Sequence, residues 1–228
     1  MDRNPILCAI DTPELARAQA LIAATQAAVG GVKLGLEFFA AHGPAGIRAA
    51  AAGQKNLFLD LKLHDIPNTV AGAVKSSLAL DPLLLTLHAA GGATMMRAAV
   101  AARGAARTKL LGVTVLTSLD DGDLAAVGQS GPAAAQVRRL ALLAQASGLD
   151  GIVCSPQEVA MLRQACGKDF LLVVPGIRPA GAVVGDQKRV QTPRDAIAAG
   201  ADYLVIGRPI TEAPDPAAAA RAIFAELP

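Results

Sequence analysis

Residues 56–69 read NLFLDLKLHDIPNT, and this stretch determines how the rest of the chain is interpreted. It begins with an apolar run of the kind that forms a buried strand, and it reaches Pro67, which suits the first turn of a helix. Since side chains two residues apart on a strand share a face, Asp60 and Lys62 point the same way, and the leucines around them take the other face. The stretch therefore predicts a strand followed at once by a helix, with opposite charges on one strand face.

The two charges need an explanation, because charge on the inward face of an apolar strand is costly unless it is paired. A structural ion pair between Asp60 and Lys62 would meet that requirement. A third charge, Asp65, lies just past the strand and tells against a purely structural pair. The pattern Asp-x-Lys-x-x-Asp at the carboxyl end of a strand instead indicates a catalytic constellation.

The same strand-then-helix rhythm runs through the chain, where short apolar runs alternate with longer Ala-rich amphipathic segments. The expected strands are 6–11, 32–36, 57–63, 83–88, 110–116, 151–155, 171–176 and 203–207, and the expected helices include 13–29, 67–80, 132–147 and 214–227. This repetition favours an α/β fold, a (β/α)₈ TIM barrel forming a single catalytic domain over residues 1–228, rather than a doubly wound sheet. No Gly-x-Gly-x-x-Gly follows the first strand to indicate a dinucleotide site.

Composition argues against several kinds of partner. The chain has 21 basic and 19 acidic residues spread along its length, for a formal net charge of +2, which predicts neither a nucleic-acid surface nor a membrane patch. Its three cysteines have no Cys-x-x-Cys spacing, so neither a disulfide framework nor a zinc site is expected. The first apolar run is too short for a secretory signal. We therefore expect a cytoplasmic protein without a metal.

Polar residues at the strand ends indicate the function, since TIM barrels build their active sites at the carboxyl ends of the strands. Asp11 ends the first expected strand, although Asp11 or Thr12 could instead cap the following helix. Lys33 lies inside the second expected strand, and the third supplies the charges of the opening stretch. Two lysines and three carboxylates converging on one end of a barrel are harder to explain by stability than any one of them.

The fifth and seventh strands carry different chemistry. The fifth is followed by Thr117 and Ser118, whose hydroxyls can bond a polar ring or an amide. An Asp- and Gly-rich stretch, 120–131, is expected to be a loop. The seventh strand is followed by Arg178 and by a Gly-rich loop, 180–191, which is longer than a connection needs and is expected to be a lid.

The eighth strand is followed by Gly207 and Arg208. A glycine that exposes backbone N–H groups beside a guanidinium, after the last two strands, is where these barrels commonly hold phosphate. The alternative role for Arg208 is a surface ion pair, but its position and the neighbouring expected lid favour phosphate.

These motifs resemble those of the orotidine 5′-phosphate decarboxylases of the bacterial type. The resemblance runs from Asp11 to the last helix, and it is most specific in the ten residues DLKLHDIPNT, 60–69. The segments VKLG, VTVLTS, PGIRP and VIGRP, which begin at residues 32, 113, 175 and 205, also carry it. No departure is found at the family's functional positions.

The resemblance implies cofactor-free decarboxylation of orotidine 5′-monophosphate to UMP, the last step of de novo pyrimidine synthesis. It makes Lys62 the general acid that protonates C6, and it sets Asp60 near the substrate carboxylate. It gives Asp65 to the active site of the neighbouring subunit, which implies a homodimer with shared sites. The substrate-binding positions that it implies are Asp11, Lys33, Ile66, Thr69, Thr117, Ser118, Arg178, Gln187, Gly207 and Arg208.

Two other functions compete with this one. A sugar-phosphate decarboxylase or aldolase of the same superfamily also resembles Asp-x-Lys-x-x-Asp but uses a divalent metal. A non-catalytic nucleotide-phosphate sensor would keep the barrel and the phosphate site. Residues 64–69 and the hydroxyl pair at 117–118 favour the pyrimidine enzyme over the first, and the intact charged set disfavours the second, because binding alone does not need buried opposing charges.

Overall fold

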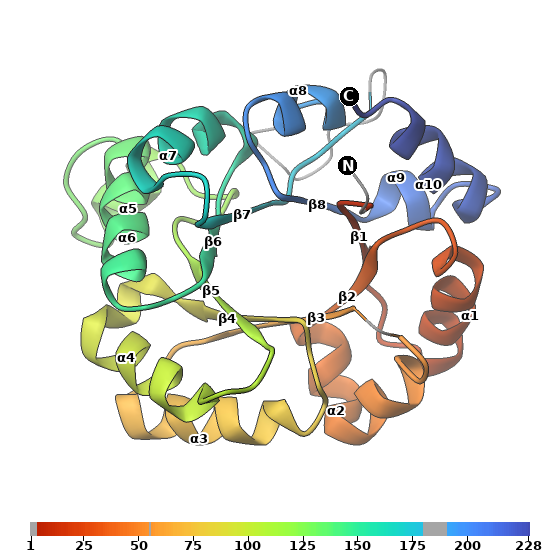
Figure 1. The fold of residues 1–228 in the computed structure, drawn as a ribbon, viewed down its shortest axis with the longest axis horizontal. Coiled ribbons are helices and arrows are strands. Elements are labelled where there is room, and N and C mark those ends of the chain that lie inside the picture. The colour runs from red at the N-terminus through yellow and green to blue at the C-terminus, as the bar shows by residue number, and fades with distance from the viewer. Residues whose placement is uncertain (1–3, 55, 180–190) are drawn as a thin grey trace.

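The computed structural model describes residues 4–54, 56–179 and 191–228. Eight parallel strands close into a barrel in which each strand pairs with the next and β8 pairs with β1 (Figure 1). The strands are β1 (Ile6–Ile10), β2 (Gly31–Gly35), β3 (Leu57–Leu63), β4 (Leu84–His88), β5 (Lys109–Val113), β6 (Gly151–Val153), β7 (Leu171–Val174) and β8 (Tyr203–Ile206). The expected TIM barrel is thus confirmed, with every expected strand present and most of them shorter than expected.

Helices surround the barrel as an outer ring (Figure 1). They are α1 (Leu15–Thr25), α2 (Leu36–Ala50), α3 (Pro67–Leu78), α4 (Gly92–Arg103), α5 (Asp121–Ala126), α6 (Ala133–Ala146), α7 (Val159–Cys166), α8 (Pro193–Ala198), α9 (Arg208–Thr211) and α10 (Pro216–Ala225), with 3₁₀ turns η1 (Ala89–Gly91) and η2 (Pro156–Glu158). Among the described residues, no helix is long and apolar enough to cross a membrane.

Local hydrogen bonds correct two expectations about the connections. The stretch 120–131 is not wholly a loop, because α5 forms within it behind a capping box in which Asp120 and Asp123 each bind the other's backbone N–H. The cap of α1 is also neither Asp11 nor Thr12. Glu14 takes that position, and the Thr12 hydroxyl accepts its backbone N–H at 3.2 Å. Asp11 is therefore left to bind elsewhere.

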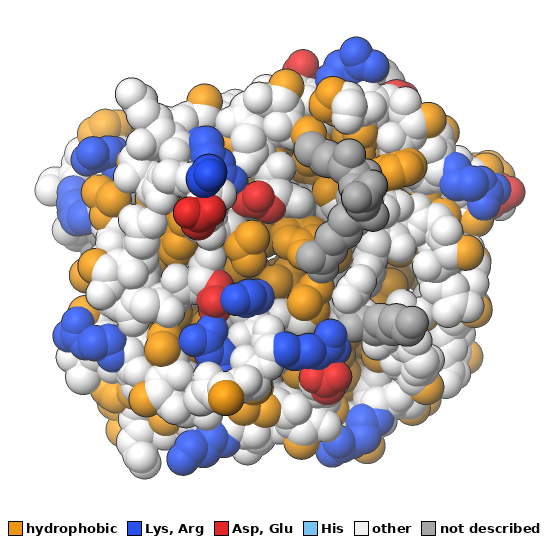
Figure 2. Space-filling model, viewed as in Figure 1, with side chains coloured by type: hydrophobic (Ala, Val, Ile, Leu, Met, Phe, Trp, Pro, Cys, Tyr) orange, Lys and Arg blue, Asp and Glu red, His pale blue; other side chains and the backbone are white. Residues whose placement is uncertain are grey.

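The barrel separates two apolar layers. A large outer layer lies between strands and helices, and a smaller inner layer fills the barrel itself with Leu7, Ala9, Phe58, Leu84, Leu111, Val173, Tyr203 and Val205. The space-filling view shows hydrophobic side chains at the centre of the barrel with Lys, Arg, Asp and Glu side chains around them (Figure 2). The interior is a packed core rather than a pore.

Strand β3 is irregular at the motif that the sequence singled out. Leu59 pairs with Leu85 and Leu63 pairs with Leu87, so three residues of β3 lie where β4 has one. Lys62 lies in this bulge with φ 51°, in the left-handed region that residues other than glycine seldom adopt. Such strain is typical of positions that serve function.

Candidate active site

A cavity of about 500 Å³ opens at the carboxyl ends of the strands. Ala9, Phe58 and Val205 line it and also belong to the inner apolar layer, so its floor is the packed core of the barrel. The charged and polar side chains that line it come from many strand ends: Asp11, Lys33, Asp60, Lys62, Thr117, Arg178, Arg208 and Glu212. Glu212, at the end of α9, was not identified from the sequence.

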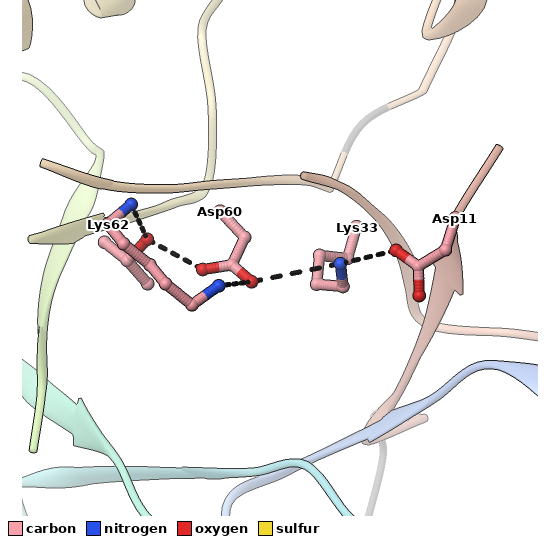
Figure 3. Close-up of polar contacts among 5 residues, drawn as sticks. Asp11, Lys33, Asp60 and Lys62 are labelled. Atoms are coloured by element: carbon pink, nitrogen blue, oxygen red, sulfur yellow. Dashed lines mark hydrogen bonds and ion pairs between the residues drawn. The ribbon is translucent and has the colours of Figure 1, made fainter. Parts of the chain in front are cut away.

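Four of these side chains form a row of alternating charge across three neighbouring strands (Figure 3). Lys62 Nζ lies 2.7 Å from Asp60 Oδ2, and Lys33 Nζ lies 3.8 Å from the same oxygen. Lys33 Nζ also donates to Asp11 Oδ1 at 3.0 Å. Each ammonium therefore lies beside a carboxylate, and the row runs from Asp11 through Lys33 and Asp60 to Lys62.

The middle of this row is removed from water while its ends are more open. The side chains of Lys33 and Asp60 are only 10% and 12% exposed, and that of Asp11 is 63% exposed. Burial by itself raises the pKa of Asp60, but the charges of Lys33 and Lys62, with hydrogen bonds to its carboxylate, outweigh burial and hold that pKa below its usual value. Asp60 is therefore a buried carboxylate that stays ionised.

Thr86 of β4 also belongs to this network and was not identified from the sequence. It is fully buried, and its hydroxyl donates to Asp60 Oδ1 at 2.8 Å while accepting the backbone N–H of Lys62 at 2.9 Å. The signal in the sequence is a single hydroxyl within the apolar run LLLTL, 83–87. A hydroxyl buried among leucines requires a hydrogen-bonding partner.

The opposite wall of the cavity carries the residues expected to hold the ring and the phosphate. Thr117 lines the cavity, whereas Ser118 is exposed and lies outside the lining. Arg178 follows β7 and Arg208 follows β8, and both line the cavity together with the glycines Gly176 and Gly207. Gln187 and the remainder of the expected lid, 180–190, lie outside the described residues.

Three residues of the motif lie away from the cavity of their own chain. Asp65, Ile66 and Thr69 are exposed and are not among the lining residues, and Ile66 is 67% exposed despite its apolar side chain. Asp65 Oδ1 accepts the backbone N–H of Ile66 at 2.6 Å. The structure therefore brings Asp60 and Lys62 together and leaves the second half of the motif on the surface.

Two histidines lie beside the charged row. The rings of His64 and His88 are 5.3 Å apart, and His88, at the end of β4, is half-buried. Burial lowers the pKa of His88, as do the neighbouring His64 and Lys62. Within the part of the chain that the structure describes, no group of three or more His, Cys, Asp or Glu side chains is placed to hold a metal ion.

Comparison with known proteins gives one consistent result. Residues 4–223 match the model of the family described as Orotidine 5′-phosphate decarboxylase / HUMPS family. Proteins named orotidine 5′-phosphate decarboxylase from Anaeromyxobacter sp. (strain K) and Thermobifida fusca (strain YX) are 58% and 56% identical to the chain, over 97% and 98% of it and 97% and 95% of their own lengths. The crystal structure of the orotidine 5′-phosphate decarboxylase from Lactobacillus acidophilus superposes with a TM-score of 0.86 at 38% identity, covering 98% of each chain.

Proposed function

The chain belongs to the orotidine 5′-phosphate decarboxylase / HUMPS family, and from this premise we propose that it is a carboxy-lyase that converts orotidine 5′-monophosphate to UMP and CO₂. The reaction needs no cofactor and is the last step of de novo pyrimidine synthesis. The single observation that carries the proposal is the buried row of alternating charges, which ends in a lysine ammonium on the cavity wall. We also propose that residues 1–228 act as one catalytic domain.

The chemical problem is the electron pair left at C6. When the bond from C6 to the carboxylate breaks, CO₂ departs and the pair stays in an sp² orbital that the ring cannot delocalise. The Lys62 ammonium stabilises this developing charge and then transfers a proton to C6, which leaves a neutral amine that water reprotonates. A fixed ammonium in a site with little water interacts with that charge more strongly than it would in bulk solvent.

Asp60 destabilises the bound substrate before the reaction, whereas Lys62 stabilises the charge that forms during it. A carboxylate that stays ionised in this row would lie near the substrate carboxylate, and the repulsion between them is relieved as CO₂ leaves. Lys33 lies between Asp60 and Asp11 and keeps the row balanced, so that Asp60 can remain charged without water. Asp11, the most open member, is available to a ribose hydroxyl.

The far wall would hold the parts of the substrate that do not react. We assign Thr117 to the pyrimidine, and Arg178, Gly207 and Arg208 to the phosphate; that all four line the cavity supports this assignment. We assign Ser118 to the ring and Gln187 to the phosphate from the family resemblance. Binding energy from the remote phosphate can then be used at the transition state.

We propose that the active enzyme is a homodimer with shared sites. Asp65, Ile66 and Thr69 are exposed away from their own cavity, which supports their reaching into the cavity of a second copy. Leu36 and Ile66 are exposed apolar side chains that follow β2 and β3, on the rim of the same barrel end. A second copy of the chain packed over this end of the barrel would cover both side chains.

One assay tests the proposed function against its competitors. We expect the purified chain to consume the absorbance of orotidine 5′-monophosphate and to form UMP equally well with and without EDTA. Activity that EDTA abolishes and a divalent metal restores would instead indicate the metal-dependent sugar-phosphate class. Binding of UMP without turnover of orotidine 5′-monophosphate would indicate the nucleotide-phosphate sensor.

A further inference from the structure

Thr86 lies at the one place where β3 and β4 do not match residue for residue. Between the pairs Leu59–Leu85 and Leu63–Leu87, β4 has this threonine alone. Thr86 shares its strand face with Leu84, which belongs to the inner layer, so its side chain lies inside the barrel. It is 0% exposed and does not line the cavity.

The hydrogen bonds of Thr86 fix which way its hydroxyl proton points. The oxygen accepts the backbone N–H of Lys62 at 2.9 Å, so the hydroxyl's own proton is free for Asp60 Oδ1, 2.8 Å away. An ionised carboxylate can only accept, which leaves the threonine as the donor of this bond. One hydroxyl therefore binds the two charged residues of β3 at once.

Each of these bonds constrains a different degree of freedom. Lys62 has φ 51° inside a bulge, and its N–H bonds to the Thr86 side chain in place of a backbone carbonyl. Asp60 has its Oδ2 bound to Lys62 Nζ at 2.7 Å, and the bond from Thr86 to Oδ1 fixes the rotation of the carboxylate plane. Without Thr86, the lysine backbone and the aspartate plane could move relative to each other.

We infer that Thr86 is a positioning residue of the reaction, which holds the Asp60 carboxylate and the Lys62 backbone in the geometry that brings their charges together. It touches neither the cavity nor the substrate and acts through those two residues. The inference rests on the proposed function for its effect on turnover. Its effect on the Asp60 carboxylate can be measured without any turnover.

The test compares three variants with the wild-type protein. Thr86→Val removes the hydroxyl and keeps the shape, and Thr86→Ser keeps the hydroxyl. Thr108→Val is the matched control, because Thr108 is also buried and donates to the Pro82 carbonyl at 2.7 Å. It lies immediately before β5, at the other end of the barrel. Turnover, affinity for UMP and thermal unfolding would be measured for each.

We expect Thr86→Val to lower kcat by about 10- to 100-fold, the usual effect of losing a hydrogen bond to a charged group. UMP lacks the reacting carboxylate, so its Kd should stay within about two-fold, and Thr86→Ser should recover most of kcat. Thr108→Val should lower the unfolding temperature and leave kcat unchanged. If Thr86→Val and Thr108→Val lose kcat equally, or if Thr86→Ser recovers none of it, Thr86 is only a packing residue and the inference is overturned.

A second measurement separates this inference from the proposed function. Side-chain ¹³C NMR of Asp60, assigned with Asp60→Asn, follows the carboxyl titration in the absence of substrate. We expect the Asp60 pKa to be higher in Thr86→Val than in wild type, since the charged groups that surround Asp60, namely Lys33, Lys62 and His88, are the same in both. An unchanged titration would overturn the inference, whereas a wild-type chain that does not decarboxylate orotidine 5′-monophosphate would overturn the proposed function alone.

Discussion

The two ends of the barrel both carry ion pairs, but the pairs are built differently. At the carboxyl end, Asp60 and Lys62 bind other side chains in a row that opens on the cavity. At the amino end, Asp150 and Asp202 each lie immediately before a strand, and each carboxylate binds the backbone of the neighbouring strand as well as a cation. The first arrangement leaves charge available to a ligand, and the second uses it to hold strands together.

The amino-end arrangement occurs twice. Asp150 precedes β6 and accepts the N–H of Leu110 in β5 at 2.9 Å, and Arg103 and Lys109 surround the same carboxylate. Two strands further on, Asp202 precedes β8 and accepts the N–H of Leu172 in β7 at 2.7 Å.

Arg163 donates to the Asp202 carboxylate at 2.6 Å. Because the same bond between a carboxylate and the backbone of the adjacent strand occurs twice, we interpret it as a contact that stabilises the barrel. The carboxylate of Asp60 is bound by side chains alone and faces the cavity, whereas those of Asp150 and Asp202 are also bound by strand backbone and hold neighbouring strands together.

The largest expected effect is on kcat, and it should follow the loss of a lysine at the carboxyl end but not at the amino end. Lys62→Ala should lower kcat by at least about 1,000-fold, because it removes both the proton donor and the charge that stabilises C6. Lys109→Ala, which breaks the ion pair with Asp150 at the amino end, should leave kcat within about two-fold. UMP binding to Lys62→Ala, measured by calorimetry, should persist. Near-normal turnover of Lys62→Ala would rule out its assigned role.

The next largest effect is the recovery of activity when two inactive variants are mixed, and it tests Asp65, which lies outside the cavity of its own chain. Asp65→Ala and Lys62→Ala should each be inactive, but mixing them should restore activity. In each hybrid dimer, one site combines an intact Lys62 with an intact Asp65.

After full exchange of equal amounts, half of the dimers are hybrids with one working site of two, so activity should reach about a quarter of wild type. Subunit exchange would be verified with differently tagged chains. No recovery despite exchange would contradict the shared site.

A smaller effect, on stability alone, is expected at the amino end. Asp202→Ala removes the partner of Arg163 and the acceptor for the Leu172 N–H, and it should lower the free energy of unfolding by about 2–3 kcal/mol. Asp202→Asn keeps an acceptor and should cost less. Both should retain wild-type kcat, measured well below their unfolding temperatures. A large loss of kcat in Asp202→Asn would contradict the view that the amino end contributes to stability and not to catalysis.

The smallest effect is a pH dependence at the carboxyl end. The pKa of Asp60 is depressed in the folded protein, so its contribution to stability is present above its unfolded pKa of about 3.9 and is lost as pH falls through the folded value. Below about pH 4, wild-type stability should fall relative to that of Asp60→Asn, by at most about 1.4 kcal/mol per pH unit. Urea unfolding at several pH values measures this. Parallel curves for the two proteins would show that Asp60 is not the group responsible.

Much of the fold could be predicted from the sequence because its signals are local. Each strand is an apolar run, and proline begins several helices, so the order of elements and the barrel follow from periodicity. The shared face of Asp60 and Lys62 likewise needs only the two-residue repeat of a strand. The prediction failed where a short local bond decided the outcome, as in the capping box of Asp120 that turns part of an expected loop into α5.

The parts of the site that could not be predicted depend on register between strands. Thr86 lies 26 residues from Asp60 in the chain, and their contact exists only because β3 bulges against β4. The left-handed backbone of Lys62 has the same origin and leaves no mark in a pattern of apolar and polar residues. The roles that we propose for Asp65, Ile66 and Thr69 would depend on a second chain, which no periodicity within one chain can describe.

The apolar floor formed by Ala9, Phe58 and Val205 closes the cavity on the side of the barrel core. Among the described residues, a substrate that enters from the carboxyl end meets the packed inner layer of the barrel. In the proposed reaction, the CO₂ released at C6 would leave through the opening by which the nucleotide entered, before or after the nucleotide product. The CO₂ and the nucleotide product of the proposed reaction would therefore share one route out of the cavity.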